Sequence, residues 1–488
     1  MAQGHIRKGF FFYFGLFVLV LFAAFMICLV VMMFNPGKTV LWMQYFTGDE
    51  TIFVDETTDD SKSAINIADV DNVVIDASIS KVTVVKNKDY ANDGIYIINK
   101  AKGFAGAKSN AQFSYSAKLE GSTLKVSVTE PNGFLYLSKD LEVVVFLNSE
   151  KNNNLNHLNL TVKTETGNVY VGETDTGAKA VYLKGLNIST TKGNVYLRQN
   201  LNTSDLQSLS VKTNSGDIYA SREIVDNGKA MLGLEISCNA NFETEKGTIA
   251  FDILKASGKT INIVCDEGIT DISRLYANEV RIACFQGNFR FGSVYANVSF
   301  NDSANTLLAP NLIADYIQGN FTISGGSEAK PDINVKKIDG LVNIVADNGS
   351  VIIKEAARSV VITSYGAMKV ELIAGASNTE QISIRNKSGD IKLGFKGVAL
   401  GNVDVKSESS KSDVTINFLD GAVFTSEVKN FDGSAYDEGK ITLNLGTTGN
   451  ISKNPLTPNN PSSSDGKITL NINGKLTYNK YNSASDIA

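Results

Sequence analysis

Few side chains in this 488-residue chain could perform acid–base or nucleophilic chemistry. His5 and His157 are its two histidines, so neither a histidine-based catalytic triad nor a multi-histidine metal site is expected. Asp217 and Asp390 are carboxylates that a polysaccharide-acting β-helix enzyme could use, with the pair ~5–9.5 Å apart in a groove. Both directly follow a glycine, however, where aspartate is favoured in turns. The sequence therefore predicts that the protein is not an enzyme, and it assigns no catalytic or cofactor-binding residue.

The cysteines are the other candidates for chemistry. Cys238, Cys265 and Cys284 follow an apolar N-terminal segment that contains Cys28. Cys265 and Cys284 lie three residues before a glycine, at a position that threonine fills in equivalent segments. If those segments stack, the two residues could reach the ~4.4–6.8 Å Cα separation of a disulfide. We prefer a reduced, buried pair because small residues fill the same position elsewhere, but the sequence leaves the disulfide open.

Neither a metal nor another cofactor is predicted. Three thiols without a neighbouring histidine make a poor zinc site. Calcium-binding solenoids carry a GGxGxDxUx repeat that this sequence lacks, and Asn168, Asn194 and Asn288 at the corresponding turns are uncharged. A sparse calcium site is the alternative to this interpretation.

A repeated phrase positions these residues. Between residues 167 and 389 an alternating apolar segment, a turn with glycine and a second alternating segment recur ten times, about every 25 residues. Alternation with period two predicts strands with one buried face. The glycine, followed by Asn or Asp in six copies, predicts a turn whose backbone angles glycine adopts at little cost. The ten glycines are Gly167, Gly193, Gly216, Gly247, Gly268, Gly287, Gly319, Gly349, Gly366 and Gly389.

One strand–turn–strand unit buries too few side chains to fold alone. About four inward side chains at roughly 1.5–3 kcal/mol each cannot offset the ordering of about 25 residues at ~1–2 kcal/mol apiece. The units must therefore stack, and the predicted fold class is an all-β solenoid with rungs ~4.8 Å apart. The longer segments 221–233 and 325–335 are expected to be loops on one side of the stack, where a partner would bind.

An apolar segment precedes the repeats. Residues 10–34 carry no charge over 25 positions, enough at 1.5 Å per residue to span the ~30 Å hydrocarbon core of a bilayer. The run is too long for an ordinary cleaved signal, and no clean small-x-small cleavage site follows it. Arg7 and Lys8 precede it and acidic residues follow it. The positive-inside rule therefore predicts a membrane anchor with a cytoplasmic N-terminus and an extracellular C-terminal ectodomain.

Charge limits the other partners. The formal net charge is −5, so no broad basic surface for nucleic acid is expected.

In the first predicted rung, residues 72–85, Ser80 stands where glycine would be expected. The predicted organisation is a cytoplasmic tail (1–9), a transmembrane anchor (10–34), an acidic stalk (35–65), irregular N-terminal rungs (66–157), regular repeats (158–400), and degenerate rungs with a C-terminal cap (401–488) that includes a Pro/Ser/Asn-rich loop (451–465).

Several segments resemble a known family. LNLTVKTETGNVYVG, LNISTTKGNVYL, LSVKTNSGDIYA and ISIRNKSGDIKLGF are similar to the repeats of the bacterial putative-adhesin family of unknown function, which read as a strand, a Ser/Gly-Asp turn and a strand. The likeness covers roughly residues 66–450, and its strongest copies lie between 158 and 220. CDEGITDI, CFQGNFRF and TSYGAMKV depart from it at the turn. The resemblance implies a β-solenoid on the bacterial cell surface, with an adhesive or envelope role and no catalytic residues to transfer.

We therefore expect a single-pass membrane protein of the bacterial cell surface. It would contact the lipid bilayer through residues 10–34 and would bind or scaffold a cell-surface or cell-wall ligand. One alternative is an accessory protein of envelope-stress signalling that acts on a membrane partner, and the second is a polysaccharide-acting enzyme. The sequence identifies neither the ligand nor the binding residues, and it leaves the oligomeric state and the handedness of the solenoid open.

Overall fold

The computed structural model describes most of the chain. The described residues are 4–34, 44–48, 50–54, 56–58, 61–63, 67–86, 94–105, 113–130, 135–138, 140–147, 157–174, 180–301, 308–326, 328–378, 380–446, 452–459, 462 and 465–487.

Helix α1 (Gly4–Phe34) begins six residues before the predicted anchor and ends with it. Its side chains are described at Gly9, from Phe12 to Ile27 and at Val30, and those from Phe12 to Ile27 are exposed. Over the described residues, no helix reaches both the length and the apolar character needed for a membrane span. The anchor over residues 10–34 therefore stays a prediction.

The described structure beyond α1 is all-β apart from three short 3₁₀ helices, η1 (Ile67–Asp69), η4 (Glu438–Lys440) and η5 (Ala484–Asp486). The N-terminal strands are β1 (Gln44–Thr47), β2 (Glu50–Phe53), β3 (Glu56–Thr58), β4 (Ser61–Ser63), β5 (Asn72–Ala77), β6 (Lys81–Val85), β7 (Gly94–Asn99), β8 (Lys102–Ala105), β9 (Ser114–Glu120), β10 (Thr123–Thr129), β11 (Leu135–Ser138) and β12 (Leu141–Phe146). The middle strands are β13 (Asn159–Thr164), β14 (Val169–Val171), β15 (Val181–Tyr182), β16 (Gly185–Thr190), β17 (Val195–Leu197), β18 (Leu201–Asn202), β19 (Ser208–Thr213), β20 (Ile218–Ala220), β21 (Arg222–Asp226), β22 (Lys229–Glu235), β23 (Ala240–Thr244), β24 (Thr248–Cys265), β25 (Ile269–Ala283), β26 (Asn288–Asn301), β27 (Asn311–Ile317), β28 (Phe321–Ser324), β29 (Asp332–Ile338), β30 (Val342–Ala346), β31 (Gly349–Ala356), β32 (Val360–Ala374), β33 (Ile382–Ser388) and β34 (Ile391–Phe395). The C-terminal strands are β35 (Val403–Ser407), β36 (Val414–Leu419), β37 (Phe424–Lys429), β38 (Ile441–Asn444), β39 (Gly466–Ile472) and β40 (Leu476–Tyr481).

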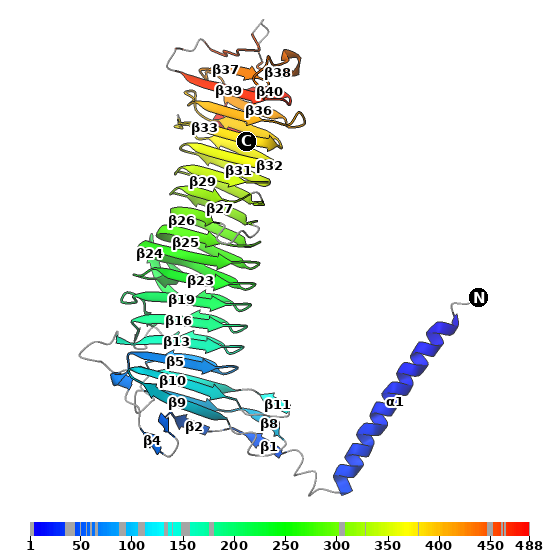
Figure 1. The fold of residues 1–488 in the computed structure, drawn as a ribbon, viewed down its shortest axis with the longest axis vertical. Helices are drawn as coiled ribbons and strands as arrows, with labels where there is room; N and C mark the ends of the chain where they lie inside the picture. Colours follow the sequence, from blue (N-terminus) through cyan, green and yellow to red (C-terminus); the bar gives the residue numbers. More distant parts are fainter. Residues whose placement is uncertain are drawn as a thin grey trace.

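The strands form an elongated stack in which each repeat pairs with the next one in parallel (Figure 1). Two series of strands run along it. From the N-terminal end of the stack, face 1 runs through β10, β5, β13, β16, β19 and β23. Face 2 runs through β12, β6, β14, β17, β20 and the first half of β24. The long strands β24, β25, β26 and β32 supply one half to each face. A strand of one face therefore finds its hydrogen-bond partners in the neighbouring repeats.

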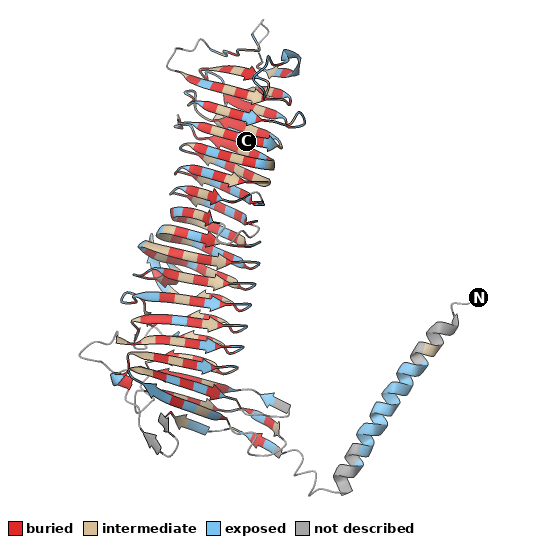
Figure 2. Ribbon diagram, viewed as in Figure 1, coloured by how far each residue is buried: buried red, intermediate tan, exposed pale blue. Residues whose placement is uncertain are grey.

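The core lies between the two faces. Buried and exposed residues alternate along the strands, as the sequence pattern predicts, and the buried positions form continuous bands through the stack (Figure 2). One column of buried side chains on face 2 runs through Val169, Val195, Ile218 and Ile249. Because the register is kept from repeat to repeat, equivalent apolar side chains contact each other and exclude water.

One of the ten predicted copies is out of phase. Gly319 lies between β27 on face 2 and β28 on face 1, whereas the other nine glycines lie where the chain passes from face 1 to face 2. In this repeat the chain passes from face 1 to face 2 between Asn301 and Asn311, and residues 302–307 lie outside the described residues. Apolar alternation flanks both bends of a repeat, so the pattern alone could not distinguish them.

Both predicted loop segments are partly strand, and they do not lie on one side. Residues 221–233 contain the hairpin β21–β22, whose turn uses Asn227 at φ 50° and Gly228 at φ 76°. It is inserted where the chain returns from face 2 to face 1. Within 325–335 the strand β29 begins at Asp332, and the shorter remaining loop lies at the opposite bend. The prediction of a single loop side was therefore wrong, because each repeat has two bends and an insertion can be accommodated at either one.

The two ends of the stack are irregular. Strands β1 and β2 lie in the range predicted to be a stalk, where they pair antiparallel with β8 and β7. At the C-terminal end the chain reverses the stacking order: β39 and β40 pair with β35 and β36, and the earlier strands β37 and β38 lie on top of them (Figure 1). The similar segments GKITLNL and GKITLNI therefore belong to different faces.

Candidate functional site

The glycines at the bends are required by close contact between repeats. A Cβ added at Gly193 would lie 2.0 Å from the carbonyl oxygen of Gly167, and one added at Gly216 would lie 2.1 Å from that of Gly193. At Gly167 the added atom would lie 1.8 Å from the carbonyl oxygen of Ser80, which confirms the place of Ser80 in the first rung. Only two of the ten glycines, Gly349 and Gly389, have a positive φ. The backbone angle predicted as the main reason for glycine is therefore a minor one.

The polar residues of the bends form hydrogen-bonded ladders along the stack. The Oδ1 atom of Asn168 accepts from the backbone N–H of Asn194 at 2.8 Å, and Oδ1 of Asn194 accepts from that of Asp217 at 2.8 Å. Oδ1 of Asp217 in turn accepts from the N–H of Thr248 at 2.8 Å. Asp390 makes the equivalent bond with the next bend. The structure does not bring Asp217 and Asp390 together, so they are not the carboxylate pair of a hydrolase.

Cys265 and Cys284 continue a ladder of threonines. Cys265 pairs in register with Thr244, and Cys238, Cys265 and Cys284 are all free and buried. Burial raises the pKa of the Cys265 thiol to about 11 and that of Cys284 to about 12. Protonated, buried thiols are poor nucleophiles. Among the residues that the structure describes, no group of three or more His, Cys, Asp or Glu side chains could hold a metal ion.

A ladder of three tyrosines lies on the outer side of face 2. Tyr170, Tyr196 and Tyr219 occupy the same register position in successive repeats. The rings of the first two stack with centroids 4.8 Å apart, and Tyr219 stacks on Tyr196 at 5.5 Å. At the lower end, Lys81 Nζ and the Arg198 guanidinium lie 5.3 Å and 4.2 Å from the centroid of Tyr170. The ladder therefore has one end covered by cations.

The other end of the ladder opens into a groove. The residue that follows Tyr219 in register is Ala250, and Asp271 follows Ala250. A methyl group thus stands where a fourth ring would continue the stack. The groove above Tyr219 has a volume of about 350 Å³, which is within the range of ligand sites. It is lined by Tyr219, Ala220, Leu232, Ala250, Phe251, Asp252, Asp271 and Ser273.

The inserted hairpin forms one wall of this groove. Leu232 of β22 is 50% exposed at the wall, and its backbone N–H donates to Asp252 at 3.3 Å. Asp226 at the hairpin turn pairs with Arg274 and accepts a hydrogen bond from the Tyr276 hydroxyl at 3.0 Å. Burial alone would raise the pKa of the Asp226 carboxyl, but these hydrogen bonds outweigh it and lower the pKa. The hairpin is therefore fixed to face 2 by charged contacts at its tip.

The hydroxyl of Tyr219 is fixed as well. It donates to Oδ2 of Asp217 at 2.9 Å, and burial together with this hydrogen bond raises the pKa of Tyr219 to about 12. The residue is therefore neutral at physiological pH. Its hydroxyl is held at the bend, and its ring face is directed along the stack toward the groove.

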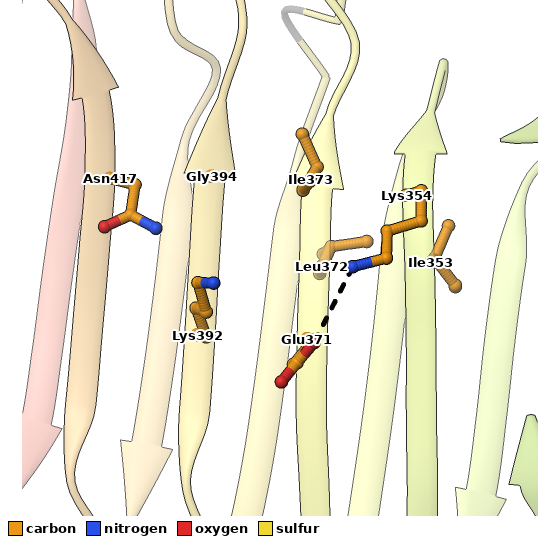
Figure 3. Close-up of a pocket in the computed structure, with 8 residues that line it drawn as sticks. All are labelled: Ile353, Lys354, Glu371, Leu372, Ile373, Lys392, Gly394 and Asn417. Carbon is orange, nitrogen blue, oxygen red and sulfur yellow. Dashed lines mark ion pairs between the residues drawn. The ribbon is translucent and has the colours of Figure 1, made fainter. Parts of the chain in front are cut away.

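Two other hollows lie closer to the C-terminal end of the stack. A groove of about 360 Å³ near the C-terminal end is lined by Ser364, Tyr365, Arg385, Asn386, Lys387, Glu408 and Phe431. A cavity on face 2, next to the ion pair between Lys354 and Glu371, has a volume of only about 10 Å³, about the space of one water (Figure 3). There Ile487 from the C-terminal tail packs so closely that a Cβ on Gly394 would lie 2.6 Å from it.

The groove was not predicted from the sequence, although one signal for it is present there. The residue three positions after the bend glycine is tyrosine in the copies at Gly167, Gly193 and Gly216, and alanine in the copy at Gly247. Leu232 and Asp226 gave no such signal, because their place depends on how the hairpin folds back on face 2.

Comparisons with known proteins add little to this geometry. No protein-family model and no curated protein matches the chain. Among solved structures, a putative cell adhesion protein from Clostridium sporogenes matches at 7% identity and a TM-score of 0.15, over 89% of this chain and 100% of the other. A putative adhesin from Parabacteroides merdae matches at 9% identity and a TM-score of 0.20, over 78% of this chain and 97% of the other. TM-scores this low carry no argument about fold or function.

Proposed function

We propose that this protein binds a ligand at the cell surface through the groove between the hairpin β21–β22 and face 2. In this proposal the repeats form a β-solenoid that projects from the membrane as an adhesin-like ectodomain. The observation that carries the proposal is the interruption of the tyrosine ladder at Ala250, beside an inserted hairpin. A regular stack presents only shallow ridges, and here an aromatic face, an apolar wall and two carboxylates converge.

The anchor belongs to the same proposal. Residues 10–34 lack charge, and Arg7 and Lys8 precede them. In α1 the described side chains of this segment are exposed, with Phe12 at 68% and Phe22 at 63%. A bilayer is the apolar environment that would cover such a helix. The N-terminus would then be cytoplasmic and the β-stack extracellular.

A matched pair of variants tests the binding proposal. The full-length protein, reconstituted in lipid nanodiscs, would be titrated with intact cell envelopes and with isolated cell-wall polymer. Leu232→Glu adds a charge to the groove wall, and Val361→Glu adds one to face 1, where Val361 is 41% exposed. We expect saturable binding that is lost in Leu232→Glu and kept in Val361→Glu. Equal binding by both variants, or equal loss, would contradict the assignment of the groove.

A polysaccharide-acting enzyme remains a second candidate because Asp252 and Asp271 line the same groove. Paired carboxylates are the catalytic groups of most glycoside hydrolases. Incubation of the protein with cell-wall polymer, followed by chromatography of the soluble products, separates binding from cleavage. Release of reducing sugars that disappears in Asp271→Asn would favour the enzyme.

A further inference from the structure

We propose that the ligand is a neutral glycan, one ring of which stacks on Tyr219 in the gap left by Ala250. This inference rests on the proposed function of the groove and adds the chemical class of its ligand. It follows from three features of the gap: its height, its open aromatic face and the charge of its rim.

The height of the gap fits one flat ring. Tyr219, Ala250 and Asp271 occupy the same column in three successive repeats. With strands ~4.8 Å apart, Tyr219 and Asp271 are separated by two steps, or about 9.6 Å. A ring lying at the ~4.5–5.5 Å spacing of stacked rings above Tyr219 would place its upper substituents within hydrogen-bonding reach of the Asp271 carboxylate.

The open ring face selects a ligand with a flat apolar surface. Tyr196 covers one face of Tyr219, and the other face borders the groove, where Ala250 offers only a methyl group. The wall at Leu232 is also apolar. A pyranose ring has C–H groups on its faces and hydroxyls on its edge. Its face would stack on the tyrosine while the edge remains available to polar groups.

The rim supplies hydrogen-bond acceptors with negative charge. Asp252 and Asp271 are exposed carboxylates at the groove, with the Ser273 hydroxyl beside them. Ionised carboxylates accept from hydroxyl groups in short, strong bonds. Arg290 follows Asp271 in the same column, but it does not line the groove. The two lining carboxylates repel phosphate, sulfate and uronate groups, so the groove disfavours acidic polymers and nucleic acid. A neutral sugar satisfies both the rim and the aromatic floor.

One substitution blocks the gap and is compatible with the fold. Ala250→Tyr would add a fourth ring to the ladder of Tyr170, Tyr196 and Tyr219 at the same register position. The new ring would fill the place of the sugar. Asn334→Tyr is the matched control, because Asn334 is exposed in the same column of face 2 but away from the groove. Asp271→Asn gives a second test that removes the rim charge and keeps the shape.

The experiment is calorimetric titration of the full-length protein in nanodiscs free of sugar-headed detergent. The probes are the neutral hexasaccharides cellohexaose, maltohexaose and mannohexaose, and the acidic control is hexagalacturonic acid. We expect saturable binding of at least one neutral probe and none of the acidic one. Affinity should fall at least about tenfold in Ala250→Tyr and in Asp271→Asn, and remain within about twofold of the parent protein in Asn334→Tyr.

The outcomes separate this inference from the proposed function. If no neutral probe binds but Ala250→Tyr abolishes envelope binding, the groove is the site and the glycan class is wrong. Preferential binding of hexagalacturonic acid overturns the inference in the same way. If Ala250→Tyr is folded by circular dichroism and binds envelopes as the parent protein does, the inference and the proposed binding function of the groove fail together.

Discussion

The contact between successive bends predicts a large cost for Gly193→Ala. The added Cβ would lie 2.0 Å from the carbonyl oxygen of Gly167, whereas real Cβ contacts are at least 3.0 Å, so the two bends must separate by about 1.0 Å. Among the hydrogen bonds that join them, two lie next to Gly193: the N–H of Lys192 donates to Glu165 O at 2.6 Å, and that of Asn194 donates to Asn168 Oδ1 at 2.8 Å. A shift of this size would break both.

The expected loss is about 3–4 kcal/mol, from two hydrogen bonds of ~1 kcal/mol each and ~1–2 kcal/mol of strain from overpacking. Two control glycines separate the cause. Gly228→Ala meets no atom within 4 Å but has φ +76°, and should cost only ~1–2 kcal/mol. Gly326→Ala meets no atom within 4 Å at an ordinary φ, and should be neutral or stabilising by up to ~1 kcal/mol.

Hydrogen exchange followed by mass spectrometry is the suitable assay, because a stack of repeats can unfold in parts and a single unfolding free energy would be poorly defined. Amides of the repeats on both sides of Gly193 should lose protection in Gly193→Ala, while the two controls affect only their own loops. If Gly193→Ala were no more costly than Gly228→Ala, the close-contact explanation of the bend glycines would be refuted.

Three further outcomes are expected. Asn194→Ala removes the acceptor for the next bend and should lower the hydrogen-exchange protection of the Asp217 amide by about 1 kcal/mol, whereas Asn194→Asp keeps that acceptor and should lower it less. Burial raises the pKa of Cys265 to about 11 and that of Cys284 to about 12, so both thiols should react with iodoacetamide at pH 8 only after unfolding. Peptide mapping measures the reaction at each cysteine. Reaction in the folded protein at the rate seen in the unfolded protein would contradict their burial. Asp226→Asn should loosen the hairpin by about 2 kcal/mol in hydrogen exchange, because Arg274 loses its partner. Because the pKa of Asp226 is lowered in the folded protein, its contribution to hairpin stability is complete above the unfolded pKa of ~3.9 and is lost as the pH falls through the folded pKa. Equal protection of the hairpin amides across that pH range would argue against a stabilising Asp226–Arg274 pair.

Local structure could be predicted well from the sequence, because apolar and polar residues alternate within every repeat. Val169, Val195 and Ile218 are buried at equivalent positions, and this could be predicted from their spacing from the bend glycine. The phase of the copy at Gly319 could not, because both bends of a repeat are flanked by the same alternation. The reason for glycine was also misjudged, since the carbonyl that a Cβ on Gly193 would meet belongs to the preceding repeat.

The C-terminal cap shows the same limit at a larger scale. In the regular repeats each strand pairs with the strand of the next repeat along the chain, which would place β37 on β35. Instead β39 lies on β35, and the earlier strand β37 lies on β39. The order of strands in a stack follows from which surfaces can be buried together, and similar segments such as GKITLNL and GKITLNI fit either face. Chain order therefore predicts stacking order only where connections are short.

Contact between repeats also explains why a binding site would arise where the repeat is broken. Inward side chains, bend glycines and the Asn/Asp ladder are all constrained by contact with the next repeat, so they have no freedom to recognise a ligand. Outward positions of face 2 are free of that constraint, but a ladder such as that of Tyr170 and Tyr196 covers its own ring faces. A ring face becomes accessible only at the end of a ladder, which here is Tyr219, and the hairpin wall at Leu232 turns that end into a groove. The interruption at Ala250 costs the stack one aromatic contact, and it creates the concave surface on which the proposed recognition depends.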